Sequence, residues 1–577
     1  MKRITALLLL TAMFVAVLAG CGYDPEDTGS IIPLYLGAEQ RNFDPTLTLY
    51  DKDTVKYLEL INEGLTVVGE DGTISKGLAK NWYTKFDEKR GEYYLYIELY
   101  PSKWNDGRSL IADHIVYAWK RLLSPETKSP AAALLYDIKN AKAVKAGDMS
   151  IDSVGIASVD NLLIEIQFEK KIDVNLFLEA IASPSLVPIR DDVVVGANAA
   201  TWATTLEELA TNGQFTIKDM TQKTSCVIEK ATAYRENDEE DVSPIKYVKP
   251  LRLLIDFTKP ISKQIDMLKA GEIYYVGGLD KAAYTANASS AKTQAMLSVM
   301  TVFFNCTKPA LAKEEARQAL STALDRNQIA DIVGAPNKPA TGFVTPGIFD
   351  STMKTSFRSV GGDIISTNAD VAKAKSLASS GGLKGTLTLA CKIGEVNKAV
   401  ADYCVSAWKE LGVTVTVNAM TDKDYTAALY SGNFDMILLD YQGLSTSAYS
   451  FLAPFATRYS GEPVSVEDNS KGYTPSVTGF ENAEYDAAID AVLAATTRAD
   501  RASLLHTAEG LFVKYMPAAP LVFYYDSYLV SSELTGLKNS AFGTRIFKDA
   551  VLKNYKDKNA AYLAKKDAKD KENTKSA

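Results

Sequence analysis

The first 21 residues constrain this chain more than any other part of its sequence. Lys2 and Arg3 precede a nearly uninterrupted apolar run that ends in Leu-Ala-Gly at residues 18–20, and Cys21 follows at once. A short positive segment, an apolar segment and small residues at a cleavage point are the layout of a secretory signal. No later apolar run reaches the length that crosses a bilayer. We therefore predict a signal peptide at residues 1–20 and a water-exposed body outside the cytoplasm.

The segment Leu18–Cys21 resembles the bacterial lipobox. The resemblance implies that the thiol of Cys21 carries a diacylglycerol and becomes the new N-terminus. Residues 21–30 would then be a lipidated tether, and the protein would touch the cell membrane, on its extracytoplasmic face, through this anchor only. The alternative is an uncleaved transmembrane anchor, because the apolar run is close to the lower length limit for a span.

The charge and cysteine content narrow the possible partners. The formal net charge is −8, and removal of Lys2 and Arg3 with the signal leaves −10. Such an acidic chain does not suit nucleic acid or an anionic lipid surface as a partner. Apart from Cys21 there are four cysteines, too few for a disulfide scaffold in a chain of this size. We expect these four to be buried and to pack as small apolar side chains; they are Cys226, Cys306, Cys391 and Cys404.

Nothing in the sequence indicates an enzyme. The chain has two histidines, His114 and His506, each within an amphipathic helical pattern and without a Cys, Asp or Glu at metal-ligand spacing. No nucleophile elbow, phosphate-binding loop, dinucleotide fingerprint or zinc-protease motif is present. We predict a protein without catalytic residues, without a metal site and without a cofactor.

Residue patterns predict a mixed α and β fold. Residues 53–63 form an amphipathic helix, and a hairpin turns at Asp71-Gly72. Residues 76–205 predict a compact α+β unit with turns at Asp106-Gly107 and Asp160-Asn161 and a helix capped by Ser109.

The second half of the chain has a different pattern. Residues 313–334 predict a pair of amphipathic helices, and residues 385–420 predict a strand–helix–strand unit on a buried sheet. Residues 556–577 are rich in lysine and low in apolar residues, and this composition predicts a disordered tail.

Several segments together resemble one family, the oligopeptide- and dipeptide-type extracellular solute-binding proteins of ABC importers, family 5. Each segment alone is weakly specific, but their order along nearly the whole mature chain is highly specific. The segments are Phe43–Pro45, Glu63–Leu65, Asp71–Trp82, Trp104–Pro125, Asn212–Phe215, Leu268–Ile273, Phe303–Arg326, Ser450–Phe455 and Met516–Val530.

The resemblance implies an α/β, two-lobed periplasmic-binding-protein-like fold of type II, in the large peptide-binding subclass with an extra α+β subdomain. Two strands near Ser298–Asn305 and Ala518–Tyr525 would cross between the lobes. The implied boundaries are lobe I at 31–75, 206–295 and 521–555, its α+β subdomain at 76–205, and lobe II at 296–520.

Three segments are the candidate ligand-binding residues. They are the wall Glu63, Gly64 and Leu65, the pair Gly277 and Gly278, and the run Asp440, Tyr441, Gln442, Gly443 and Leu444. Simple packing or turn chemistry is the alternative role for each of them.

The last segment departs from the family pattern. Peptide binders of this family carry an Asp that pairs with the free α-amine of the peptide, and counting back from Phe451-Leu452 puts Leu444 at that position. A gap of about four residues would instead put Asp440 and Tyr441 there. Recognition of a free amine therefore stays open between these two alignments.

The resemblance implies a monomeric binding lipoprotein that captures a peptide-like solute and delivers it to ABC transporter permease subunits. An oligosaccharide or a metal chelate is the alternative ligand, and a receptor or interaction role without transport is the alternative function. Sugar binding would call for several tryptophans in the cleft, and the chain has five in total. A hydrolase is a third possibility, but the sequence shows no pattern of a nucleophile with a neighbouring base.

Overall fold

The computed structural model describes residues 29–37, 39–40, 42–46, 53–127, 129–194, 202–232, 234, 248–459 and 478–576, without the side chains of Tyr430 and of residues 566–576. The predicted signal peptide, Cys21 and most of the tether lie outside the described residues. Among the described helices, none combines the length and the apolar content needed to cross a bilayer.

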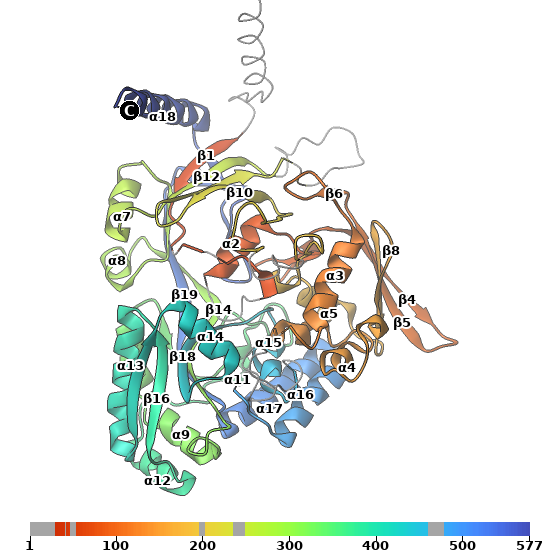
Figure 1. Ribbon diagram of the computed structural model, residues 1–577, viewed down its shortest axis with the longest axis vertical. Coiled ribbons are helices and arrows are strands. Elements are labelled where there is room, and N and C mark those ends of the chain that lie inside the picture. The colour runs from red at the N-terminus through yellow and green to blue at the C-terminus, as the bar shows by residue number, and fades with distance from the viewer. Residues whose placement is uncertain are drawn as a thin grey trace, which may run out of the picture.

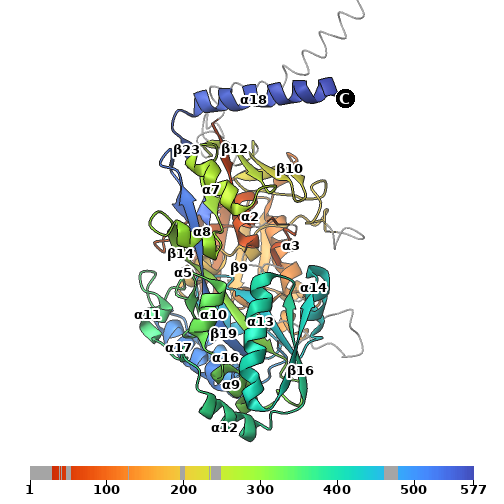
Figure 2. The same ribbon diagram turned by 90° about the vertical axis from the view of Figure 1, so that its left-hand side faces the viewer.

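Two thirteen-residue strands connect two bodies of the protein. β14 (Lys292–Phe304) and β19 (Ala518–Val530) are antiparallel partners. At one end β19 also pairs with β13 (Tyr275–Gly277), and at the other end β14 pairs with β18 (Met436–Gln442). Figures 1 and 2 show these strands running between an upper and a lower body.

We name the body on the β13 side lobe I, residues 29–291 and 531–576, and the body on the β18 side lobe II, residues 305–517. The predicted two-lobed fold is confirmed. The two crossing strands are longer than expected, so the boundaries predicted between 295 and 296 and between 520 and 521 fall inside β14 and β19.

Lobe II contains the predicted strand–helix–strand unit. β16 (Thr386–Lys392) and β17 (Thr414–Met420) are parallel and are joined by α13 (Glu395–Trp408), while β18 lies parallel to β16 on its other side. Val400, Cys404 and Trp408 recur every four residues and are buried, because one face of the helix packs on the sheet. The helix pair is also present, as α9 (Glu314–Thr322) and α10 (Arg326–Val333).

Lobe I has a four-stranded sheet in the order β1 (Ser30–Leu34), β12 (Pro250–Asp256), β11 (Ser225–Lys230) and β10 (Phe215–Thr221). β1 runs parallel to β12, and the other neighbours are antiparallel. The helix predicted at residues 53–63 is α2 (Thr54–Ile61). The predicted hairpin is formed by β2 (Thr66–Val68) and β3 (Ile74–Lys76).

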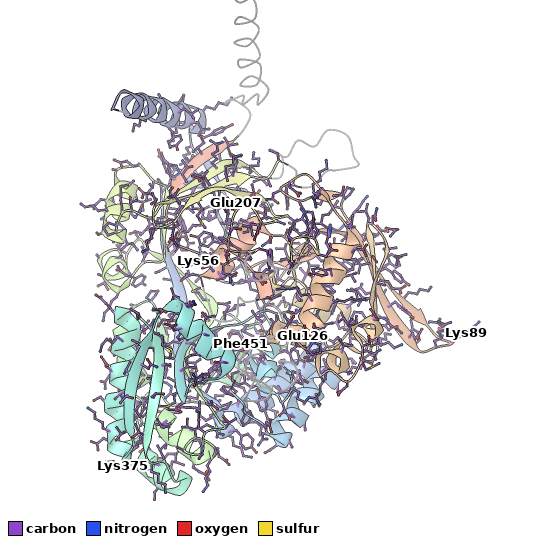
Figure 3. All side chains as sticks on the ribbon, viewed as in Figure 1. Lys56, Lys89, Glu126, Glu207, Lys375 and Phe451 are labelled. Carbon is purple, nitrogen blue, oxygen red and sulfur yellow. The ribbon has the colours of Figure 1, made fainter. Side chains whose placement is uncertain are left out.

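The α+β unit has its own sheet, in the order β4 (Ala79–Asp87), β5 (Glu92–Leu99), β9 (Leu163–Phe168) and β8 (Ile156–Asp160). Alternate residues of β5 are buried, which is the pattern of a sheet with one covered face. Figure 3 places Lys89 at the outer tip of the β4–β5 hairpin and Lys375 at the far end of lobe II.

The helix of this unit begins later than its sequence predicts. α3 spans Ala112–Leu123, and its N-cap is Ile111 rather than Ser109. Ser109 belongs instead to the short strand β7 (Ser109–Leu110), which pairs with β6 (Ser102–Lys103). The ring of His114 takes the capping role, because its Nδ1 accepts the backbone N–H of Ile111 at 3.2 Å.

The prediction of a disordered C-terminal tail is wrong, since α18 (Tyr555–Ser576) is helical. Alanine and lysine favour helix, and the first turns are attached to the rest of lobe I. Asn559 accepts the N–H of Ile31 and donates to the carbonyl of Gly29, both at 2.9 Å. Figures 1 and 2 show α18 at the end of the molecule that is far from lobe II.

The interior does not divide cleanly between the lobes. The largest apolar cluster extends from Ile32 and Trp119 in lobe I to Phe303 of β14 and Phe512 of lobe II. Cys226, Cys391 and Cys404 are buried and free, and Cys306 is half-buried and free. Burial raises the pKa of the Cys404 thiol to about 12, so this group is an apolar packing residue.

The remaining elements complete the two lobes. They are η2 (Pro130–Leu135), α4 (Ala141–Lys145), η3 (Ile151–Ser153), α5 (Val174–Ala180), η4 (Pro184–Leu186), α7 (Ile261–Lys269), α8 (Lys281–Ala286), β15 (Lys338–Pro339), α11 (Phe357–Gly361), α12 (Val371–Gly381), η6 (Lys409–Leu411), α14 (Asp422–Ser431), α15 (Tyr449–Leu452), η7 (Ala453–Phe455), α16 (Ala483–Ala494), α17 (Arg498–Tyr515), β20 (Leu534–Thr535), β21 (Lys538–Asn539), β22 (Arg545–Ile546) and β23 (Val551–Leu552).

Candidate functional site

Charged side chains join the α+β unit of lobe I to α17 of lobe II. The guanidinium of Arg501 donates to both carboxylate oxygens of Asp137, at 2.6 and 2.9 Å. The carboxylate of Glu179, in α5, accepts hydrogen bonds from Arg498 and from the hydroxyl of Thr446. These contacts join the two lobes.

A small cavity lies among these contacts, and we name it the interlobe cavity. Its volume is about 40 Å³, and both lobes contribute to its wall. Lobe I contributes Ala133, Leu134, Asp137, Leu176, Glu179 and Ala180, and lobe II contributes Phe349, Asp350, Phe357, Ser445, Ser447, Tyr449, Arg498, Arg501, Ala502 and Leu505. The Tyr449 side chain is 8% exposed, and its hydroxyl has no hydrogen-bond partner among the described residues.

An open groove of about 650 Å³ lies beside this cavity, and Phe349 is part of the lining of both. We name it the interlobe groove. Its walls are Glu70, Asp71 and Ala541 of lobe I, Thr293–Ala295 of β14, and Pro346–Phe349 and Met353–Ser356 of lobe II. A ligand in the cavity and the groove would therefore contact both lobes at once.

A buried carboxylate fixes the lobe II side of the groove. Glu509 of α17 is 1% exposed and accepts the backbone N–H groups of Phe343 and Val344, each at 2.9 Å, and the guanidinium of Arg358. Because Val344 lies two residues before Pro346, where the segment that lines the groove begins, Glu509 holds the chain just ahead of that segment.

The two arginines of the cavity differ electrostatically. Burial lowers the pKa of Arg498 to about 10. Burial also lowers the pKa of Arg501, but the hydrogen bonds and the charge of Asp137 outweigh it, and the net pKa of Arg501 is raised. The environment therefore compensates the charge of Arg501 better than that of Arg498.

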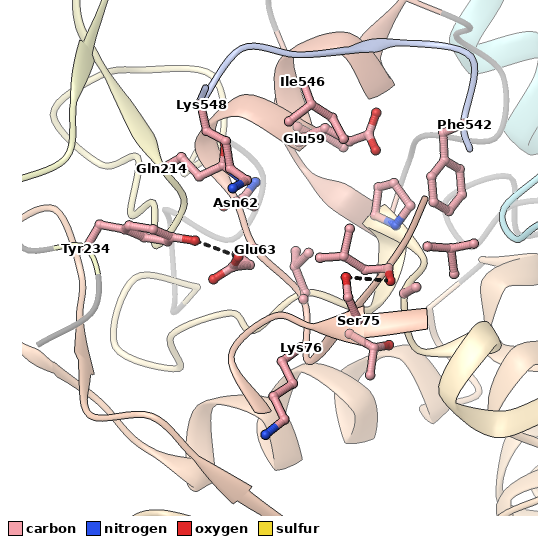
Figure 4. A pocket seen from close by; sticks show the side chains of 18 residues that line it. Glu59, Asn62, Glu63, Ser75, Lys76, Gln214, Tyr234, Phe542, Ile546 and Lys548 are labelled. Carbon is pink, nitrogen blue, oxygen red and sulfur yellow. Dashed lines mark hydrogen bonds between the residues drawn. The ribbon is translucent and has the colours of Figure 1, made fainter. Parts of the chain in front are cut away.

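A third cavity lies within lobe I and has a volume of about 210 Å³. We name it the lobe I cavity, and Figure 4 shows it from close by. Glu63 and Tyr234 lie on one side, joined by a hydrogen bond of 2.6 Å, and Glu59 and Phe542 lie on the other. Burial raises the pKa of Glu59 against the lowering effect of hydrogen bonds from Ser540 and Thr544. Its lining comes from one lobe, so lobe closure does not assemble this cavity.

Comparison with known proteins identifies the family to which this chain belongs. A family model described as bacterial extracellular solute-binding proteins, family 5 Middle, matches residues 73–462. The chain belongs to this family.

Characterised relatives cover almost the whole chain. The dipeptide-binding protein DppE of Bacillus subtilis is 26% identical over 537 residues, covering 90% of this chain and 92% of DppE. The oligopeptide-binding protein OppA of the same organism is 24% identical over 581 residues, covering 96% and 100%. The solved structure of Listeria monocytogenes OppA bound to peptide shares the fold, with a TM-score of 0.73 and 19% identity over 91% of this chain and 99% of that chain.

The first candidate segment of this family 5 protein lines the lobe I cavity in part. Glu63 and Gly64 are in its wall, and the backbone N–H of Glu63 bonds the side chain of Asn212 at 3.3 Å. Leu65 is 1% exposed and belongs to the apolar core. None of the three lines the interlobe cavity or the groove.

The second candidate segment has a packing role. Gly277 lies in β13, where a Cβ atom would be 2.9 Å from the ring of Tyr275. Gly278 has a φ of +62°, and a Cβ atom added to it would lie 3.1 Å from the Cα of Gly37. A positive φ and a close approach of two backbones both require glycine. Neither glycine lines the three cavities described above.

The third candidate segment ends where the interlobe cavity begins. Gln442, Gly443 and Leu444 are buried, and a Cβ atom on Gly443 would be 2.1 Å from the ring of Phe451. The next residues, Ser445 and Ser447, are the ones that line the cavity. The predicted run 440–444 therefore ends one residue before the part of the chain that lines the cavity, and its role in ligand binding stays a prediction.

Asp440 and Tyr441 point to opposite faces of the sheet. Asp440 accepts the hydroxyl of Tyr524 at 2.6 Å on the face that α13 covers. Tyr441 is buried on the other face and donates to the carbonyl of Phe451 at 3.1 Å. This geometry does not support the gapped alignment, which would need Asp440 to face a ligand between the lobes.

The charged residues of the interlobe cavity were missed by sequence reasoning. Glu179 sits within the apolar run "VNLFLEAIA", and an acidic residue inside such a run is the one signal that could have indicated it. Arg498 and Arg501 are three residues apart and so share one face of the first turn of α17. Among the described residues, no group of three or more His, Cys, Asp or Glu side chains could hold a metal ion.

Proposed function

We propose that this protein captures a peptide-like solute between its lobes and delivers it to the permease subunits of an ABC transporter. The observation that carries the proposal is the interlobe cavity with its groove, whose walls come from both lobes. A ligand that contacts both walls favours the closed over the open arrangement, and this population shift is how a two-lobed binding protein responds to its solute.

The chemistry of the walls suits a peptide better than a sugar. The cavity presents carboxylates, guanidinium groups, hydroxyls and a few aromatic rings, which can bind the polar backbone and the ends of a short peptide. A sugar site would place tryptophan faces against the ligand. Trp104, Trp119, Trp202 and Trp408 are instead buried, and no tryptophan lines the cavity or the groove. The names of the relatives, a dipeptide-binding and an oligopeptide-binding protein, support the same ligand class.

Removal of a bound peptide should open the molecule. Bound peptide is first removed by unfolding, dialysis and refolding. We expect X-ray scattering to give a smaller radius of gyration for the protein saturated with a mixture of tri- to pentapeptides than for this ligand-free protein. The melting temperature should rise as the peptide concentration exceeds the dissociation constant. Native mass spectrometry should identify the peptides retained. An envelope and a melting temperature that do not respond to the peptide mixture would refute capture of peptides by lobe closure.

Membrane attachment through Cys21 is the second part of the proposal, and the lipobox resemblance supports it. We expect Cys21→Ser to leave the protein as an unprocessed precursor or to release it from the membrane fraction, because the serine hydroxyl cannot form the thioether. Fractionation and the intact mass of the purified protein provide the measurement. A variant with the mature mass and the membrane association of the wild type would show that Cys21 is not the anchor.

A further inference from the structure

The helix α18 lies beside the first described residues of the chain. Asn559 of α18 donates to the carbonyl of Gly29 and accepts the N–H of Ile31, both at 2.9 Å. Lys558 holds the helix to lobe I through the carboxylate of Glu533, at 2.7 Å. Figures 1 and 2 both show α18 lying across this end of the molecule rather than along its long axis. The point where the predicted tether joins the folded body is therefore fixed against α18.

The length of the tether limits how far this end can lie from the membrane. Seven residues separate Cys21 from Gly29, and a fully extended chain spans at most about 29 Å over these eight steps. The 22 residues of α18 give the helix a length of about 33 Å. With Cys21 in the bilayer, a position that rests on the second part of the proposed function, the membrane surface lies no farther from this end of the molecule than the length of α18 itself.

Charge is distributed unevenly between α18 and the rest of the chain. Residues 555–576 contain seven lysines and four acidic residues, a net charge of +3. The mature chain carries −10, so removing the +3 of α18 leaves −13 on the remainder. The acidic character that argues against an anionic lipid surface as a partner therefore belongs to the body of the protein, and α18 has the opposite sign.

The exposed side of α18 suits a charged surface and not an apolar one. The exposed residues of the part whose side chains are described are Lys556, Asp557, Ala560, Ala561, Ala564 and Lys565. None of these six is a large apolar residue, so this side of the helix has nothing to insert between acyl chains. Lysines near a bilayer are instead attracted to anionic headgroups, over a range of about one Debye length.

We propose that α18 is a basic contact surface that rests on the anionic headgroups of the membrane to which Cys21 is anchored. The lysines of α18 are attracted to that surface and the acidic body is repelled from it, so this end of the molecule faces the bilayer and lobe II points away. The tether carries Asp24, Glu26 and Asp27, which compete for the same lysines. A bilayer presents headgroups along the whole helix, whereas the tether offers three carboxylates, so the bilayer is the larger source of negative charge.

The test uses the mature, lipidated, full-length protein inserted into vesicles of phosphatidylcholine with or without about 30% phosphatidylglycerol. Förster transfer from a donor dye on the protein to an acceptor lipid measures their proximity. The dye is attached at Ala560→Cys in α18 or at Lys375→Cys, at the far end of lobe II in Figure 3. Protein without either substitution, treated with the same dye, gives the background from the native cysteines.

Two sets of substitutions remove the same amount of positive charge from opposite ends of the molecule. In α18 the excess charge is removed by replacing three lysines with glutamine, which keeps a good helix former at each position; they are Lys556, Lys565 and Lys571. The control replaces three exposed lysines of lobe II with glutamine; they are Lys384, Lys409 and Lys423.

At low salt the dye on α18 should show transfer at least about twofold higher in the anionic than in the neutral vesicles, and the dye on lobe II should show little transfer in either. Salt of about 0.5 M, or the α18 substitutions, should lower the transfer to the neutral level, because both remove the attraction. The lobe II substitutions should leave it unchanged.

Equal transfer in the two kinds of vesicle would refute the membrane surface as the partner of α18. If the α18 substitutions still lowered that transfer, the carboxylates of the tether would be the partner instead. A purified protein whose mass lacks the diacylglycerol would refute the anchor at Cys21 and this inference with it, but not the capture of peptides.

Discussion

Replacement of Glu509 with alanine is expected to lower the free energy of unfolding by about 3–5 kcal/mol, because removing one partner of a buried ion pair leaves the other charge buried and uncompensated. The Glu509 and Arg358 side chains are 2% and 7% exposed. Without the carboxylate, Arg358 loses its countercharge, and the N–H groups of Phe343 and Val344 lose their acceptor. Urea unfolding followed by circular dichroism measures the change. Peptide affinity should fall as well, because these N–H groups hold the chain just ahead of the groove segment.

A matched control lies on the same helix. Lys514 pairs with Glu484, and both side chains are about half exposed. Lys514→Ala should change the stability by less than about 1 kcal/mol, since exposed ion pairs contribute little. Replacement of both Glu509 and Arg358 with leucine should restore part of the loss, because no unpaired charge then remains buried. A Glu509→Ala variant as stable as Lys514→Ala would contradict the role assigned to this carboxylate.

Local patterns predicted the local structure well. The strand–helix–strand unit of lobe II was predicted because β-branched strands and a helix with buried residues four apart leave a clear sequence signal. The hairpin at Asp71-Gly72 was predicted for the same reason, since Asp-Gly favours a tight turn. Both depend on contacts between residues that are close in the sequence.

The site could not be predicted in the same way. Glu179 and Arg498 are 319 positions apart, and Asp137 and Arg501 are 364 apart. Only the folding of the chain into two lobes brings these residues together, and no local periodicity encodes that. The sequence signal of two consecutive glycines was equally ambiguous, because a ligand-binding wall and a close approach of two backbones both favour glycine. At Gly277 and Gly278 the second cause applies.

Tyr441 shows the same ambiguity for an aromatic residue, since its position suggested a ligand contact and its surroundings are those of the core. Its ring centroid lies 5.1 to 5.8 Å from those of Phe303, Phe343, Phe451 and Phe455. The side chain is 0% exposed. Figure 3 places Phe451, a member of this cluster, in the interior where lobe II meets the α+β unit.

Two substitutions distinguish the core role of Tyr441 from a ligand contact. Tyr441→Ala should lower the free energy of unfolding by about 3–5 kcal/mol, because it leaves a cavity among four aromatic rings. Tyr441→Phe removes only the hydrogen bond to the Phe451 carbonyl and should cost about 0.5–1.5 kcal/mol. Since the hydroxyl is bonded to the Phe451 carbonyl and Tyr441 lines neither the interlobe cavity nor the groove, the Phe variant should bind the peptide mixture with the affinity of the wild type in calorimetry. A tenfold loss of affinity in Tyr441→Phe at near wild-type stability would instead mean that the hydroxyl contacts the ligand in solution.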